Sequence, residues 1–108
     1  MWMFLKDSFL SIVADRGHKG RLLVRARIKG DLERVFPHAK VLSLKNSDYC
    51  YRAFVERAEV MRVIAAQVEA IDYPNFKDEV QRASGSSRHD AYFKVWAVMR
   101  DCQKAGPL

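Results

Sequence analysis

The chain of 108 residues contains little of what marks several large classes of protein. It has two cysteines, Cys50 and Cys102, which are isolated from one another in the sequence. A disulfide-stapled secreted scaffold is therefore not indicated, and we expect reduced thiols in the cytoplasm. No apolar run approaches the ~20 residues that cross a bilayer, so no membrane partner is expected. The apolar N-terminal segment has no basic region before it, and we expect it to belong to the fold rather than to a signal peptide.

The sequence also lacks the short motifs of familiar active sites. His18, His38 and His89 share no metal-ligand spacing, and no CxxC or HxxxH pair is present, so no metal site is expected. Glycine-rich phosphate loops and the GxSxG nucleophile motif are absent as well. We therefore expect no cofactor and no catalytic residue. Because acid–base catalysis needs only one well-placed Asp or His, an enzyme acting on a phosphorylated small molecule stays open as an alternative.

The composition is that of one ordinary globular domain. Hydrophobic residues make up 49% and charged residues 30%, and we find no internal repeat, linker or low-complexity tract. The length suits a single domain over residues 1–108 and is too short for two.

Hydrophobic periodicity predicts five strands and four helices. The predicted strands cover 2–5, 9–14, 21–28, 40–44 and 49–56. The predicted helices cover 30–37, 57–71, 75–83 and 87–104. The resulting order, β-β-β-α-β-β-α-α-α, predicts an α+β fold with a ferredoxin-like antiparallel sheet, helices on one face and a C-terminal helical appendage.

Two finer features of the helices are predicted from spacing. One apolar stripe along 57–71 is expected to be buried. It comprises Val60, Met61, Ile64, Ala65, Val68 and Ile71. The last helix is expected to begin with a capping box formed by Ser87 and Asp90.

The positive charge is concentrated in the first half of the chain. Residues 1–54 hold eleven Lys/Arg against five Asp/Glu, and residues 55–108 hold eight of each, so the whole excess of +6 lies before residue 55. The strand at 21–28 alternates, which places Arg21, Arg25 and Arg27 on one face at intervals of ~7 Å per two residues. Arg52 lies on a strand that is expected to be a neighbour. Such a face attracts phosphates or acidic surfaces.

We therefore expect a small non-enzymatic module that binds nucleic acid or an acidic protein surface through this arginine-lined face. Sheets that bind single strands combine basic residues with aromatic rings on which bases stack. The aromatic run of the ribonucleoprotein motif is missing here, and parity places the aromatic residues apart from the arginines. A plain solvated face is the alternative.

The segment "IDYPNFKDEV" (71–80) joins two predicted helices and is open to two interpretations. As a corner, it caps the next helix through Asp72 or Asn75. As a site, it forms a rim where Asp72, Tyr73, Asn75 and Lys77 meet the arginine strand. In either case Asp72 is expected to bind Arg27 or Arg52.

The motifs "LLVRAR" (22–27), "DYxYR" (48–52), "IDYxNFK" (71–77) and "AYxxVW" (91–96) occur in this order after an initial Met-Trp. In this the chain resembles a family of small uncharacterised bacterial and phage proteins. The resemblance covers nearly the whole chain and implies kinship without an assigned activity. The residues that carry it are Arg25, Arg27, Asp48, Tyr49, Tyr51, Arg52, Asp72, Tyr73, Asn75, Phe76, Lys77, Tyr92 and Trp96. It adds an alternative function: an inhibitor or accessory protein of a phage or mobile element, for example an anti-defence or anti-CRISPR protein, that occludes another protein.

The open face of the sheet raises one further expectation. Leu23 and Phe54 are expected to lie among the arginines, with Phe9 and Val13 as further candidates, and a large apolar patch is not left bare. We expect the last helix to join the helical layer and the open face, or an edge strand, to pair with a second copy as a homodimer with two-fold symmetry.

Overall fold

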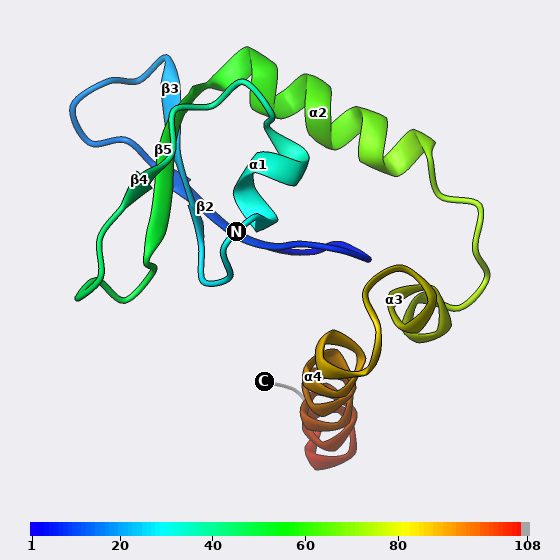
Figure 1. The fold of residues 1–108 in the computed structure, drawn as a ribbon. Helices are drawn as coiled ribbons and strands as arrows, with labels where there is room; N and C mark the ends of the chain where they lie inside the picture. Colours follow the sequence, from blue (N-terminus) through cyan, green and yellow to red (C-terminus); the bar gives the residue numbers. More distant parts are fainter. Residues whose placement is uncertain (107–108) are drawn as a thin grey trace. The chain divides into compact units, whose positions relative to one another are not determined.

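The computed structural model describes residues 1–106 and has the predicted α+β fold. Five strands and four helices follow one another in the predicted order (Figure 1). The strands are β1 (Trp2–Phe4), β2 (Phe9–Ala14), β3 (Arg21–Ala26), β4 (Leu42–Ser43) and β5 (Tyr51–Glu56). The helices are α1 (Asp31–Val35), α2 (Arg57–Glu69), α3 (Phe76–Ser84) and α4 (Ser86–Ala105).

The chain divides into two compact units, the first over Met1–Asp72 and the second from Tyr73 onward. The first unit contains the whole sheet with α1 and α2, and the second contains α3 and α4. The predicted C-terminal helices are therefore a unit of their own.

The five strands form one antiparallel sheet in the order β1-β2-β3-β5-β4. The predicted antiparallel sheet and the α+β class are confirmed. Each pairing has a defined register, for example Ile12 opposite Val24 and Val24 opposite Ala53. Because directly opposed residues lie on the same face, these pairs identify the inner side of the sheet.

Helices α1 and α2 cover this inner side (Figure 1). The buried cluster combines strand residues with Leu32, Phe36 and Val60 from the helical layer. Its strand members are Leu10, Ile12, Val24, Ala26, Ala53 and Val55. Alternation along β3 buries Val24 and Ala26 and leaves Arg25 on the opposite side, as the period of two requires.

The side of α2 that packs on the sheet differs from the predicted stripe. Val60, Val63 and Ile64 lie in or against the core, at the i, i+3, i+4 spacing of one helical face. Met61 and Val68 belong to the adjacent stripe and are exposed. The prediction was wrong because it joined two neighbouring stripes into one, which apolar composition alone permits.

In the second unit, α3 and α4 pack against each other. The rings of Phe76 and Tyr92 stack with centroids 5.8 Å apart. Gly85 separates the helices with a φ of +84°, a backbone conformation that favours glycine. This turn starts α4 at Ser86 with no side-chain cap, so the predicted capping box is wrong. Across residues 1–106, no helix has the length and apolar composition needed to cross a membrane.

Candidate functional site

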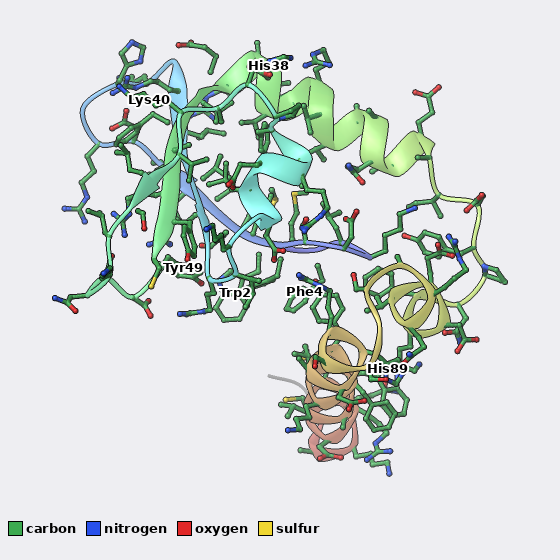
Figure 2. The ribbon with its side chains drawn as sticks, viewed as in Figure 1. Trp2, Phe4, His38, Lys40, Tyr49 and His89 are labelled. Atoms are coloured by element: carbon green, nitrogen blue, oxygen red, sulfur yellow. The ribbon has the colours of Figure 1, made fainter. Side chains whose placement is uncertain are left out.

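The side of the sheet opposite α1 and α2 is called the arginine face here and is formed by outward residues of all five strands. One row crosses it from strand to strand because each residue directly opposes the next: Trp2, Ser11, Arg25, Arg52 and Leu42. Figure 2 shows Trp2 and Phe4 projecting from β1 on the side away from α1. Arg21, Arg25 and Arg52, predicted to share a face, are thus brought together by the pairing of β3 with β5.

Arg25 and Arg52 form the centre of this face. They are direct partners across β3 and β5, an arrangement that costs free energy because the two side chains carry like charges. Arg25 Nη2 donates to Ser11 Oγ at 2.9 Å, and Arg52 Nη2 donates to Ser47 Oγ at 2.7 Å. Both Nε atoms are buried without a hydrogen-bond partner.

No carboxylate among residues 1–106 forms an ion pair with Arg25 or Arg52. A buried donor without an acceptor costs about 1–3 kcal/mol, and more when the group is charged. Two adjacent guanidinium groups with unused donors therefore form a site that an anion would stabilise.

Arg27 lies just past the end of β3 and is neutralised by an acid. Its Nη1 donates to the backbone oxygen of Asp48 at 2.8 Å and to Asp48 Oδ1 at 3.0 Å. The hydrogen bond that the Asp48 carboxylate accepts raises the pKa of Arg27 above its ordinary value. Arg27 and Arg25 also lie over the ring of Tyr49, with Cζ 4.0 and 4.5 Å from its centroid. Tyr49 is only 4% exposed, so its ring is a buried surface on which both guanidinium groups pack.

Arg21, at the start of β3, also has an acid partner. Its Nε donates to Asp15 Oδ2 at 2.8 Å, and this bond lowers the pKa of Asp15. The Arg21 guanidinium lies over the Phe54 ring, 4.6 Å from the centroid. Arg21 and Arg27 are therefore charge-compensated, whereas the central pair is not.

Aromatic side chains share the arginine face, as expected for Phe54 on the open face but contrary to the argument from parity. Phe54 is 43% exposed and Trp2 is 67% exposed. Phe9 lies between two rings, 6.3 Å from Trp2 and 4.7 Å from Phe4 by centroids. The parity argument failed because alternation orders residues within one strand only. The register between β1, β2 and β3 decides which aromatic residues join the arginines.

The residues predicted from the segment 71–80 form a helix corner. Asn75 caps α3, since its Oδ1 accepts a hydrogen bond from the Asp78 amide at 3.0 Å. Tyr73 packs on Phe76 with centroids 5.9 Å apart, and Lys77 Nζ lies 4.7 Å from the Trp96 ring centroid.

The predicted anchor through Asp72 is wrong. Arg27 binds Asp48 and Arg52 binds Ser47, because the turn at 44–50 lies beside both strand ends and its oxygens are nearer in sequence and space. Asp72 ends the first unit, while the other three residues of the predicted rim belong to the second.

Several residues of the face were missed by sequence reasoning. Ser11 and Ser47 hold the central arginines, and Trp2 supplies an exposed ring. The only sequence signal for them was the aromatic content of the first two strands.

Both thiols, Cys50 and Cys102, are free. In the described part of the chain, no group of three or more His, Cys, Asp or Glu side chains is placed to hold a metal ion.

Comparison with protein-family models, with curated proteins and with solved structures gives no match for this chain. The site is therefore interpreted from its own geometry. Two uncompensated guanidinium groups, with the exposed Trp2 ring and the Arg21 guanidinium on the same face, have the chemistry to bind phosphate groups and to stack planar bases.

Proposed function

We propose that the arginine face binds single-stranded nucleic acid, as a binding module without chemistry of its own. One observation carries the proposal: Arg25 and Arg52 are paired across the sheet with unpartnered Nε atoms and no acid partner within residues 1–106. A phosphate group bound over the pair supplies the missing negative charge and acceptors for the Nη groups, while the Nε atoms stay buried. Guanidinium groups suit phosphate because they donate along two parallel bonds.

The exposed rings favour a single strand over a duplex. A base can stack on Trp2, or on the Arg21 guanidinium that covers Phe54, only if it is not already stacked within a helix. Sheet-based binders of single strands use this combination of aromatic platforms and basic residues, and one base–aromatic stack contributes about 1–3 kcal/mol. An acidic protein surface would satisfy the arginines but would leave the rings unused.

The direct test is fluorescence anisotropy with labelled oligonucleotides of one length, single-stranded and duplex, over a salt series. We expect the single strand to bind more tightly than the duplex. Its log–log salt slope should be about −0.7 per phosphate contact. Absence of binding to single strands even at low salt would overturn the proposal.

Matched substitutions separate the site from general positive charge. Arg25→Ala and Arg52→Ala should each weaken binding by roughly tenfold and reduce the salt slope by about one contact. Arg62→Ala removes the same charge from α2, where Arg62 is paired with Glu59 at 3.5 Å, and should change binding less than twofold, roughly. Equal losses in all three variants would show that only net charge matters.

A protein partner is the second candidate, favoured by a separate observation on α4. Five large apolar side chains of this helix are at least 41% exposed: Phe93, Val95, Trp96, Val98 and Met99. Exposed apolar groups on one element are typical of protein-binding surfaces. An inhibitor that occludes another protein would lose its partner on Trp96→Ala, whereas oligonucleotide binding by the arginine face would be unchanged.

A further inference from the structure

A small polar cavity lies at the end of the arginine face that Phe54 and Glu56 occupy. Its volume is about 200 Å³, and its lining includes Arg21, His38, Lys40, Phe54, Glu56 and Glu59. It runs along the part of β5 beyond Arg52, the last residue that β4 pairs. Figure 2 shows His38 and Lys40 near the end of the sheet opposite Tyr49.

The lining offers both hydrogen-bond donors and an acceptor that are not used within the described residues. Arg21 is held by Asp15, and Glu59 contacts Arg62 at 3.5 Å. The side chains of Lys40 and Glu56 form no hydrogen bond or ion pair with any residue in 1–106. The cavity therefore presents an ammonium donor and a carboxylate acceptor to whatever enters it.

The presence of Glu56 determines which part of a nucleotide fits. A carboxylate repels a phosphate group, so the cavity is not a second phosphate site. The volume is below the ~300–1,000 Å³ of ordinary small-molecule sites, which suits a single planar group rather than a whole cofactor. Phe54 and Arg21 both line the cavity, and the Arg21 guanidinium covers the Phe54 ring. A base stacked on this guanidinium would have one edge directed at these polar groups.

We propose that this cavity recognises guanine in the bound single strand, an inference that rests on the proposed function. Guanine has two adjacent donors, N1–H and N2–H₂, that match one carboxylate. It also has the acceptors O6 and N7, which Lys contacts in specific recognition. Adenine presents only N6–H₂ as a donor on the corresponding edge, and Glu56 would find no paired donors there.

The geometry along β5 supports this assignment. Because side chains alternate along a strand, Arg52, Phe54 and Glu56 share one face of β5, spaced ~7 Å per two residues. A phosphate held by Arg25 and Arg52 would place the attached or neighbouring base over the Arg21 guanidinium that covers Phe54, with its edge toward Glu56. Affinity then comes from Arg25 and Arg52, and base specificity comes from the residues at the end of β5.

The test uses the full chain and three labelled single strands that are identical except for one position, which carries guanine, inosine or adenine. Inosine keeps N1–H and O6 but lacks the N2 amino group. We expect guanine to bind about tenfold more tightly than adenine, with inosine between them. Glu56→Ala should remove the preference, and Glu56→Gln should reduce it. The Glu56 side chain forms no cap bond at the start of α2, so these changes leave the helix intact.

Glu69→Ala, which removes the same charge from the other end of α2, is the matched control and should keep the preference. The ratio of guanine to adenine affinity is the readout, because loss of a negative charge strengthens all three complexes together. Binding of all three strands with equal affinity overturns the guanine assignment and leaves the proposed function standing. Absence of binding to any strand overturns both.

Discussion

The four arginines of the sheet face differ in what neutralises them. Arg21 has Asp15 and Arg27 has Asp48, each at hydrogen-bond distance. Arg25 and Arg52 have only a serine hydroxyl each and, for Arg52, the more distant backbone oxygen of Tyr49 at 3.5 Å. The outer pair is thus fixed in place by acids, while the inner pair keeps its charge for a ligand.

The pairing of Asp15 with Arg21 predicts a stability change in acid. Arg21 lowers the pKa of folded Asp15 below its unfolded value of about 3.9. A lowered pKa contributes stability that is present above about pH 4 and is lost as the pH falls through the folded value. Asp15→Asn should therefore be less stable than the wild type at neutral pH, and the difference should shrink below about pH 4.

Urea unfolding at neutral pH and in steps below pH 4 measures this difference. In an Arg21→Ala background the same Asn substitution should show little pH dependence, since the partner is gone. A difference that stays constant with pH would assign the effect of Asp15 to packing instead.

Asn75 offers a second test at a single residue. Because its side chain caps α3, Asn75→Ala should cost about 1 kcal/mol of stability, whereas Asn75→Asp should retain the cap. Thermal unfolding followed by circular dichroism compares the two. If both variants keep full stability but bind oligonucleotides less well, the corner interpretation of this residue is wrong.

At the scale of elements, the two sides of the sheet in the first unit differ: one packs against α1 and α2 as the core, and the other is the arginine face. Val24 and Ala26 of β3 contribute to the core, and Arg25 between them belongs to the arginine face. Alternation along each strand therefore places core residues and arginine-face residues side by side. The core side also receives α2, but only one stripe of that helix is used.

Helix α2 supplies a matched pair of substitutions. Val60 is 2% exposed, and Val68 is 63% exposed on the same helix. Val60→Ala removes two buried methyl groups and leaves a small cavity, so it should cost about 2 kcal/mol. Val68→Ala should change stability by less than about 0.5 kcal/mol. Urea unfolding of both variants decides this, and equal losses would show that the second half of α2 is also covered.

At the scale of the whole molecule, the excess positive charge and the arginine face lie in the same half of the chain. The excess of +6 lies entirely in residues 1–54, which include β1 to β4 and the start of β5. The second half is neutral, so long-range attraction of a polyanion acts on the first unit.

The homodimer predicted from the sequence would compete for this same face. Two copies joined there would bring Arg25 and Arg52 of each copy close to one another, and salt screens such repulsion. We therefore expect a monomer at low salt, with any dimer appearing at high salt and dissociating when a single strand is added. Sedimentation velocity with and without oligonucleotide measures both. A dimer that forms at low salt and is insensitive to the oligonucleotide would use another surface.

Features that depend on interactions between residues near in sequence were predicted better than features that depend on contacts between distant segments. The order of nine elements and the outward direction of Arg21 and Arg25 were predicted correctly, because alternation and helical periodicity are local properties of the chain. Strand ends were less accurate: the strand expected at 40–44 is Leu42–Ser43 in the structure. A short edge strand has few pairing partners that could extend it.

The sequence by itself determined the α+β class, the positive first half and the arginine-bearing strand. Which residues surround those arginines was decided only by tertiary structure. The register of β1 and β2 places Trp2 and Ser11 in the row of Arg25, and the pairing of β3 with β5 brings Arg52 directly opposite it. The fold of the turn at 44–50 supplies Ser47, Asp48 and Tyr49 as partners. The reason is physical: periodicity orients a side chain relative to its own backbone, whereas a site needs side chains from segments far apart in sequence. Their distances are set by strand pairing and core packing.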